Sequence, residues 1–310
     1  MAAPRAYWGL YGFGKAMEAP VRSAASFEHG LATLGNVLGA TPQRVEEMRS
    51  AFRTLSRDVG MLPKDFMGAA QDLIGRGMDE GEAMASLRDL GEFAVATGTK
   101  MEDAASSAFS AWQNMGIGHD QLRAGLNIMG KSSQLGGFEV PHMARNLPAL
   151  TGLAEVWGIT GLEGMASLGA MLQVSLRNAA TPDIGANNMR NLLAAMGREE
   201  TSKNFLERGV DIEARLARAR KRGQNPVEVF IAAAAKLSKG GDPQILGKLI
   251  TDQQARDAAI AMIQNRLDRG DKLGYETIRD RSLQARDAPR DADVIAQGRA
   301  RMQATTQKQG

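Results

Sequence analysis

The sequence predicts an all-α protein, with many short helices joined by Gly- and Pro-rich turns and packed as a helical bundle or array without a sheet. Apolar residues recur at three- and four-residue steps along most of the chain, which is the spacing of an amphipathic helix. β-branched residues are sparse, and this disfavours strands. Gly makes up 35 and Met 17 of the 310 residues, whereas aromatic residues make up 5%. Such a composition is typical of short helices that pack closely through small side chains.

The length and composition of the chain limit the class of protein that it can be. A chain of 310 residues is long enough to bury a substantial core, as one large or two ordinary domains. The absence of cysteine excludes disulfides, thiolate metal sites and thiol nucleophiles. No apolar run reaches the length of about 18 residues that a transmembrane helix needs. The stretch Tyr7–Gly14 is too short and too Gly-rich for a signal peptide.

Charge is distributed unevenly along the chain. Residues 1–200 hold 17 Lys and Arg against 21 Asp and Glu, whereas residues 201–310 hold 21 against 14. A basic segment of this kind indicates either a nucleic-acid or anionic-membrane partner, or a solvated helix face on which bases and acids alternate. The densest basic run lacks interleaved aromatic residues, so it is no stacking platform for single strands. This run contains Arg215, Arg218, Arg220, Lys221 and Arg222.

Four segments are expected: an N-terminal aromatic arm (1–26), a core helical domain (27–197), a helical continuation of that core (198–267) and a polar helical or disordered tail (268–310). The arm either inserts at a membrane interface or docks the N-terminus onto a neighbour or another copy of the chain. Its aromatic cluster comprises Tyr7, Trp8, Tyr11 and Phe13. In the tail, apolar residues at helical steps are few, so this segment is expected to be either a solvated helix or disordered.

The first helices of the core follow from periodicity and end signals. Phe27 opens a helix that Gly39 ends. Thr41-Pro42 supplies an N-cap and a first-turn proline for the next helix, which stops at Gly60. A third helix starts at Pro63 and ends by Gly75.

Three further helix starts show the capping-box spacing, in which a hydroxyl or carboxylate and a Glu three residues later satisfy free backbone N–H groups. Gly98 is expected just past the end of the helix that precedes the second box. The boxes are Asp79 with Glu82, Thr99 with Glu102, and Thr160 with Glu163.

The stretch from Glu139 to Gly197 is predicted to hold three helices separated by a tight break and a Gly/Asn-rich joint. Because proline disfavours helix in the residue before it, Thr181-Pro182 is expected to break the chain. The joint Ala179–Asn191 then either fixes the angle between the Thr160 helix and a helix over Arg190–Met196, or is an ordinary exposed loop. In the first case Arg190 serves packing or a partner.

Several turns occur in an order that resembles the core domain of phage tail tape measure proteins. The similarity extends from about Phe27 to Leu267, including the Asn225-Pro226 start of a helix. Ile250-Thr251-Asp252 departs from the family pattern, where an aromatic-Gly pair is expected. The matching segments are Gly77–Ala83, Ala96–Ala104, Phe109–Ile117, Gly185–Leu193 and Gly209–Asp211.

The resemblance implies a structural virion protein that scaffolds tail-tube assembly, sets tube length and is released during genome delivery. It implies a place in the tail lumen or tail tip, and in the host cytoplasm during assembly. The implied partners are other copies of the chain, tail-tube and tail-tip or baseplate proteins, and the host membrane during ejection, with no cofactor and no small-molecule substrate. The structural or interaction candidates are Gly98, Thr99, Glu102, Thr160, Glu163, Gly185, Ala186, Arg190 and Leu193.

Two other classes compete: a basic helical module that binds DNA or a membrane surface, and an enzyme. The three His residues have no metal-ligand spacing, and no complete phosphate-binding Gly motif occurs. Glu155 and Glu163 stand among apolar residues in the sequence, where a carboxyl group is suited to general-acid work. Since no motif pairs Glu155 with a second carboxylate, we expect no catalytic and no metal site.

Overall fold

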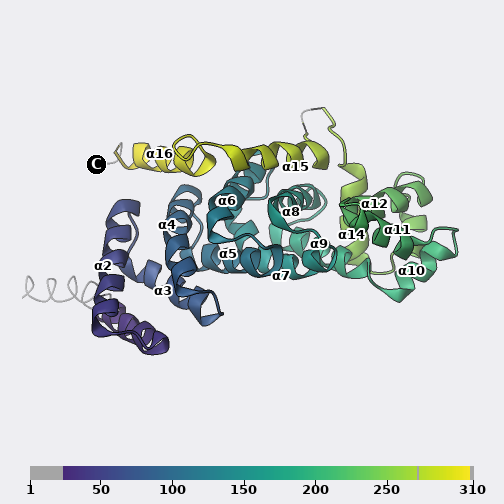
Figure 1. The fold of residues 1–310 in the computed structure, drawn as a ribbon. Coiled ribbons are helices and arrows are strands. Elements are labelled where there is room, and N and C mark those ends of the chain that lie inside the picture. Colours follow the sequence, from purple (N-terminus) through teal and green to yellow (C-terminus); the bar gives the residue numbers. More distant parts are fainter. Residues whose placement is uncertain (1–23, 271, 308–310) are drawn as a thin grey trace, which may run out of the picture. The chain divides into compact units, whose positions relative to one another are not determined.

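The computed structural model describes residues 24–270 and 272–307, with side chains to residue 305, and these residues are helical with short connections (Figure 1). No strand occurs in this part of the chain, and the all-α prediction is confirmed; one isolated bridge joins Arg269 to Lys272. The aromatic cluster of the predicted N-terminal arm lies outside the described residues. After a helix over residues 24–38, the elements are α2 (Pro42–Val59), α3 (Pro63–Gly75), α4 (Glu80–Thr97), α5 (Met101–Met115), α6 (His119–Gln134), α7 (Val140–Val156), α8 (Gly161–Leu176), α9 (Pro182–Ala195), α10 (Glu199–Leu206), α11 (Ile212–Lys221), α12 (Pro226–Leu237), α13 (Pro243–Leu249), α14 (Gln253–Gln264), α15 (Tyr275–Gln284), η1 (Ala285–Asp287) and α16 (Val294–Gln307).

The chain divides into two compact units, Met1–Gly91 and Glu92–Gly310, and the division falls inside α4. In the first unit the helix over residues 24–38 packs with α2 and α3 around buried aromatic and aliphatic side chains. Phe27 and Phe52 meet edge to face with their ring centroids 6.4 Å apart. This geometry is the favourable one for two aromatic rings.

Several helix ends form as their local sequence predicts. Thr41 Oγ1 accepts a hydrogen bond from Arg44 N at 3.3 Å, and Asn225 Oδ1 accepts one from Val227 N at 3.0 Å. Gly98 has φ +70°, in the left-handed region that favours glycine after a helix C-terminus. These signals depend only on neighbouring residues, which is why they are legible in the sequence.

Helix α8 is the centre of the second unit. Every residue from Gly164 to Ser175 is buried, and the helix contacts α5, α6, α7, α9, α14 and α15. A helix covered on all sides has to be apolar or small on all sides, and this explains its Gly-, Ala- and Met-rich composition. Figure 1 shows α8 nearly end-on among its neighbours.

Helices α10 to α14 form a second layer of short helices in this unit. Phe205 of α10 and Phe230 of α12 are buried against each other, with ring centroids 5.2 Å apart. α14 links this layer to α8 and α9. Ile250, at the departure from the expected family pattern, is fully buried, and Asp252 caps α14 by accepting a hydrogen bond from Ala255 N at 2.9 Å.

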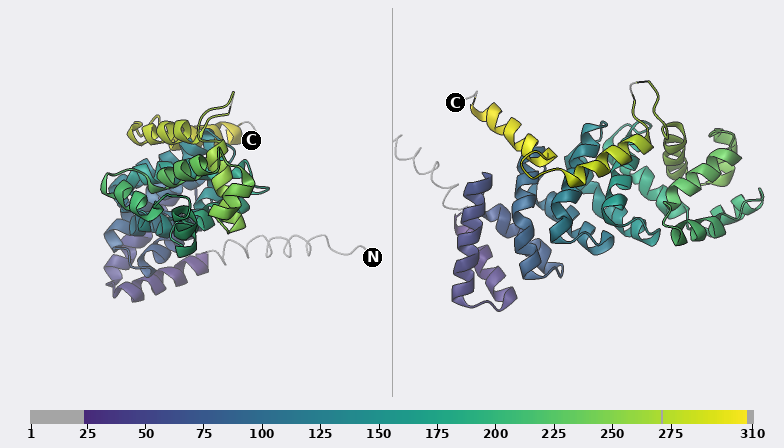
Figure 2. Two further views of the ribbon diagram at one scale, coloured as in Figure 1. Left: turned by 90° about the vertical axis from the view of Figure 1, so that its right-hand side faces the viewer. Right: turned by 45° about the horizontal axis from the view of Figure 1, so that its top comes forward.

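The described residues of the C-terminal segment form the helices α15 and α16, which is the helical alternative expected for this tail, and these helices pack against other helices of the unit instead of being solvated on all sides. α15 contacts α8 and α6, and α16 contacts α6 (Figures 1 and 2). Tyr275, Ile278 and Ile295 are almost fully buried in these contacts. The few apolar residues of this polar segment therefore suffice to dock it, because α6 and α8 provide the opposite surface.

Two of the predicted capping boxes do not form. α5 begins one residue later than expected, with Lys100 at the N-cap, and the Thr99 hydroxyl shares a 2.8 Å hydrogen bond with Thr97. Thr160 does occupy the N-cap of α8, but its side chain makes no capping hydrogen bond. The Asp79 carboxylate, in contrast, accepts hydrogen bonds from the first turn of α4, from Gly81 N at 2.8 Å.

The predicted joint at Ala179–Asn191 is wrong in extent. Thr181 caps a helix by accepting a hydrogen bond from Ile184 N at 3.3 Å, and Pro182 occupies its first turn. α9 therefore runs through the Gly/Asn-rich segment instead of starting near Arg190. The cause lies in the packing, since Gly185 and Ala186 are buried and a Cβ at Gly185 would lie 3.2 Å from Ser175 Oγ and 3.3 Å from Leu176 N of α8.

Candidate functional site

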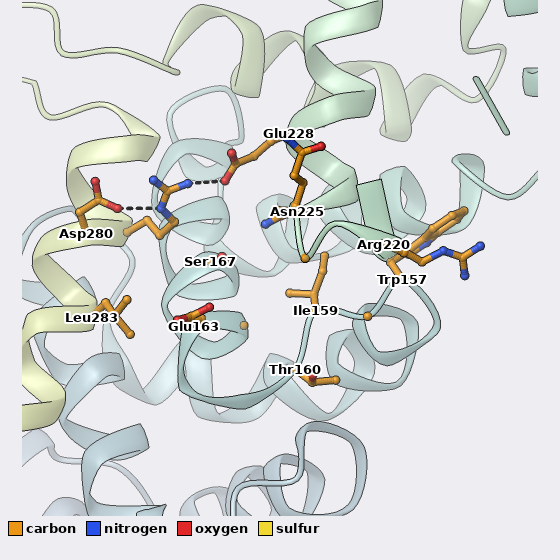
Figure 3. A pocket seen from close by; sticks show the side chains of 15 residues that line it. Trp157, Ile159, Thr160, Glu163, Ser167, Arg220, Asn225, Glu228, Asp280 and Leu283 are labelled. Carbon is orange, nitrogen blue, oxygen red and sulfur yellow. Dashed lines mark hydrogen bonds and ion pairs between the residues drawn. The ribbon is translucent and has the colours of Figure 1, made fainter. Parts of the chain in front are cut away.

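A pocket of about 380 Å³ lies in the second unit. It is bounded by the α7–α8 turn, the first turns of α8, the α11–α12 connection and α15. Trp157 and Arg220 form one side, Glu228 and Asp280 the other, and Thr160 and Glu163 lie at the start of α8 (Figure 3). The pocket thus collects residues that are more than 120 positions apart in the chain.

A charged network holds one side of the pocket together. The Arg279 guanidinium forms an ion pair with Glu228 and donates from Nε to Asp280 Oδ1 at 2.8 Å (Figure 3). Tyr275 donates its hydroxyl proton to Glu228 Oε1 at 2.9 Å, and Asn225 Nδ2 donates to the same hydroxyl at 3.3 Å. α12 and α15 are therefore tied by side chains from both helices.

The opposite side is formed by Trp157, whose indole ring is covered by Arg220. Trp157 Nε1 donates to the Leu193 carbonyl of α9 at 2.9 Å, and this bond orients the indole ring. The Arg220 guanidinium lies 5.7 Å from the ring centroid, within the range of a cation–π contact. Arg220 Nη1 also donates to the Val156 carbonyl at 3.3 Å. These contacts connect the end of α11 to the end of α7.

The charged network fixes the protonation states of two of its own groups. Burial, followed by the nearby Glu228 charge, raises the pKa of the Tyr275 hydroxyl. Burial acts to lower the pKa of Arg279, but its hydrogen bonds and charge contacts with Asp280 and Glu228 outweigh it and raise that pKa. Both groups therefore keep their protons at neutral pH. No group of three or more His, Cys, Asp or Glu residues within the described part of the chain is placed to hold a metal ion.

The expectation that Glu155 and Glu163 lie in apolar surroundings is wrong, because both side chains are exposed. Glu163 is at the pocket, whereas Glu155 is not among the lining residues. Neither Thr160 nor Ser167, the two hydroxyls of the pocket, forms a hydrogen bond with a carboxylate of the described residues. General-acid and nucleophilic roles therefore gain no support from the geometry.

The other predicted candidates fall into two groups. Ala186 and Leu193 are buried in α9 together with Gly185, and Arg190 is exposed on the same helix beside a smaller hollow of about 120 Å³. The second group lies at the α4–α5 turn, and the structure does not bring it to the pocket. It consists of Gly98, Thr99 and the exposed Glu102.

Sequence reasoning missed the residues that form the sides of the pocket. Glu228 stands 47 positions before Tyr275 and 51 before Arg279, and no local motif joins it to them. Tyr275 did carry a signal, since it is followed by Ile278 at a helical step. The charged residues around it hid the signal.

The comparisons decide the family. Residues 49–262 match the family described as phage-related minor tail protein. The chain belongs to this family. It is also similar to the probable tape measure protein of Burkholderia phage BcepMu, with 30% identity over 244 residues, which is 76% of this chain and 28% of that relative. No solved structure matches.

Family membership makes the chain a structural protein of a phage tail, in agreement with the motifs that resemble tape measure proteins. The match spans the end of the first unit and most of the second, from α2 to α14. It includes α8, the α7–α8 turn and the Trp157 side of the pocket. None of the helices in the described residues is long and apolar enough to cross a bilayer.

Proposed function

We propose that this tail protein is a tape measure protein, or the folded region of one, which scaffolds assembly of the tail tube, sets its length and leaves during genome delivery. The observation that carries the proposal is the 30% identity to a probable tape measure protein over 76% of the chain. A rod-like helix elsewhere in such a protein would convert residue number into tube length, at about 1.5 Å per residue.

The described region contributes to that role as a scaffold. Its longest helices have 18 residues, so it is a folded body and no continuous rod. A wholly helical chain of this length would instead span roughly 465 Å. We infer that the folded helices present the surfaces on which other tail components assemble.

The partners we propose are tail-tube proteins, tail-tip or baseplate proteins and further copies of this chain, with contact to the host membrane at ejection. The Gly-, Ala- and Met-rich surface of α8 is used inside the chain, since that helix is buried. Contacts with other copies therefore have to use exposed surfaces. Light scattering and pull-down with tube and tip proteins test this, and a strictly monomeric chain that captures neither would contradict it.

The role in assembly is tested by disrupting the gene in the phage and supplying the intact chain from a plasmid. We expect no normal tails without the chain and full recovery with it. Release is tested by mass spectrometry of particles before and after DNA ejection. The chain should be present in full particles and depleted from emptied ones; equal amounts in both would refute release.

A further inference from the structure

Helix α11 and its C-cap residue Arg222 carry four cations on one face. Arg215, Arg218 and Arg222 are separated by three and four residues, and Lys221 is three residues after Arg218. Residues at these spacings are neighbours on a helix surface. Ile212, Leu216 and Ala219 form the other, buried face of the helix. We call the four cations the α11 basic stripe.

The stripe has no internal counter-charge. None of its four side chains forms an ion pair with any residue that the structure describes, whereas Lys203 and Arg266 of the same unit pair with acids at 2.7 and 2.8 Å. Glu213 is the acidic residue of α11. It stands two residues before Arg215, and residues at that spacing do not face each other on a helix.

Four close cations repel one another, and a polyanion relieves that repulsion. Arg guanidinium groups match phosphate oxygens with two parallel hydrogen bonds. From Arg215 to Arg222 the chain rises by about 10 Å along the helix axis, which corresponds to about three steps between successive phosphates of one DNA strand at 3.4 Å each. Four cations thus match four successive phosphates. The spacing therefore fits a nucleic-acid backbone.

Other polyanionic surfaces fit less well. An interfacial membrane helix inserts an exposed apolar face, but the apolar face of α11 is buried within the unit. Single strands are held by exposed aromatic rings. Trp157, which lies beneath Arg220 of α11, is only 9% exposed.

We propose that the α11 basic stripe is a sequence-independent binding surface for the phosphate backbone of double-stranded DNA. Binding depends on charge and not on base identity, because side chains that contact phosphates carry no sequence information. The surface is independent of the pocket and of the proposed role in tube length.

The test is a titration of the whole chain with a fluorescent duplex at several salt concentrations. With four phosphate contacts, a plot of log affinity against log salt should have a slope of about −3 to −4. Changing all four stripe residues to Gln should lower the affinity at least tenfold and flatten the slope. Gln keeps the helix propensity close to that of Arg and Lys, and circular dichroism checks that the fold is retained.

A second quadruple variant controls for net charge. Arg53, Arg57, Lys64 and Arg145, all exposed, are changed to Gln, which removes the same three Arg and one Lys. We expect this variant to bind DNA like the unchanged chain. Equal losses in both variants, absence of DNA binding, or preferential binding to vesicles with anionic lipid or to polyglutamate would each overturn the proposal.

Discussion

Asp293 is the residue whose change should reveal most about how the C-terminal segment is held. Its carboxylate is fully buried and accepts hydrogen bonds from Arg123 Nε at 2.6 Å, Asn127 Nδ2 at 3.0 Å and Ala296 N at 2.8 Å. Arg123 also binds Glu92 at 2.7 Å, and Glu92 binds Arg299 at 2.9 Å. The cluster therefore joins α4, α6 and α16.

The substitution Asp293→Asn removes the charge and keeps the shape. Hydrogen bonds with a charged partner are about twice as strong as neutral ones, and each contributes about 1.5–3 kcal/mol. Replacing a charged acceptor by a neutral one therefore costs about 1 kcal/mol per hydrogen bond. At three hydrogen bonds this lowers the free energy of unfolding by about 3 kcal/mol, which agrees with the lower end of the cost of breaking a buried ion pair. Asp291→Asn, at an exposed position two residues away, is the matched control and should change stability by less than about 0.5 kcal/mol.

The assay is urea unfolding followed by tryptophan fluorescence in a Trp8→Phe background, because the remaining Trp112 and Trp157 both belong to the second unit. Burial raises the pKa of Asp293, but hydrogen bonds from Ala296, Arg123 and Asn127 outweigh it and lower that pKa below its ordinary value. A lowered pKa contributes stability above the unfolded value of about 3.9, which is lost as the pH falls through the folded value. Asp293→Asn should flatten this acid loss; equal stability of both Asn variants would refute the reasoning.

Two further substitutions test the packing of α9 and α15. Gly185→Val forces a Cβ to within 3.2 Å of Ser175 Oγ and 3.3 Å of Leu176 N and should lower the free energy of unfolding by about 1–3 kcal/mol. The control Gly68→Val places a Cβ with nothing within 4 Å and should change that free energy by less than about 1 kcal/mol. The same cost at both positions, measured by thermal unfolding, would show that the α8–α9 contact is unimportant. Tyr275→Phe removes the hydroxyl between Glu228 and Asn225 and should cost about 1 kcal/mol in urea unfolding, and an unchanged midpoint would argue against the network.

Helix ends and the fold class could be predicted from the sequence of this chain, whereas contacts between distant residues could not. Thr41-Pro42 and Thr181-Pro182 carry the same helix-start signal. The second nevertheless predicts a break, because proline disfavours helix in the residue before it and a Gly/Asn-rich segment follows. Packing against α8 overrides the weak helix propensity there. The fold class needed only composition and periodicity, which local sequence contains.

The charged clusters show the limit most clearly. Arg123 and Asp293 are 170 positions apart, and alternating charges in this part of the chain are typical of a solvated face. Only the docking of α16 on α6 turns them into a buried network. Similarly, the pocket beside Trp157 depends on the arrangement of four separate segments, which no motif in the sequence encodes.

Tail length tests the central claim most directly. Helical inserts of four and eight heptads are placed after Gly310 in the phage gene, outside the packed helices α15 and α16, and tails are measured in electron micrographs. A tape measure should lengthen tails by about 42 and 84 Å, at 1.5 Å per added residue. Infectious particles whose tails keep their original length with both inserts would contradict the account.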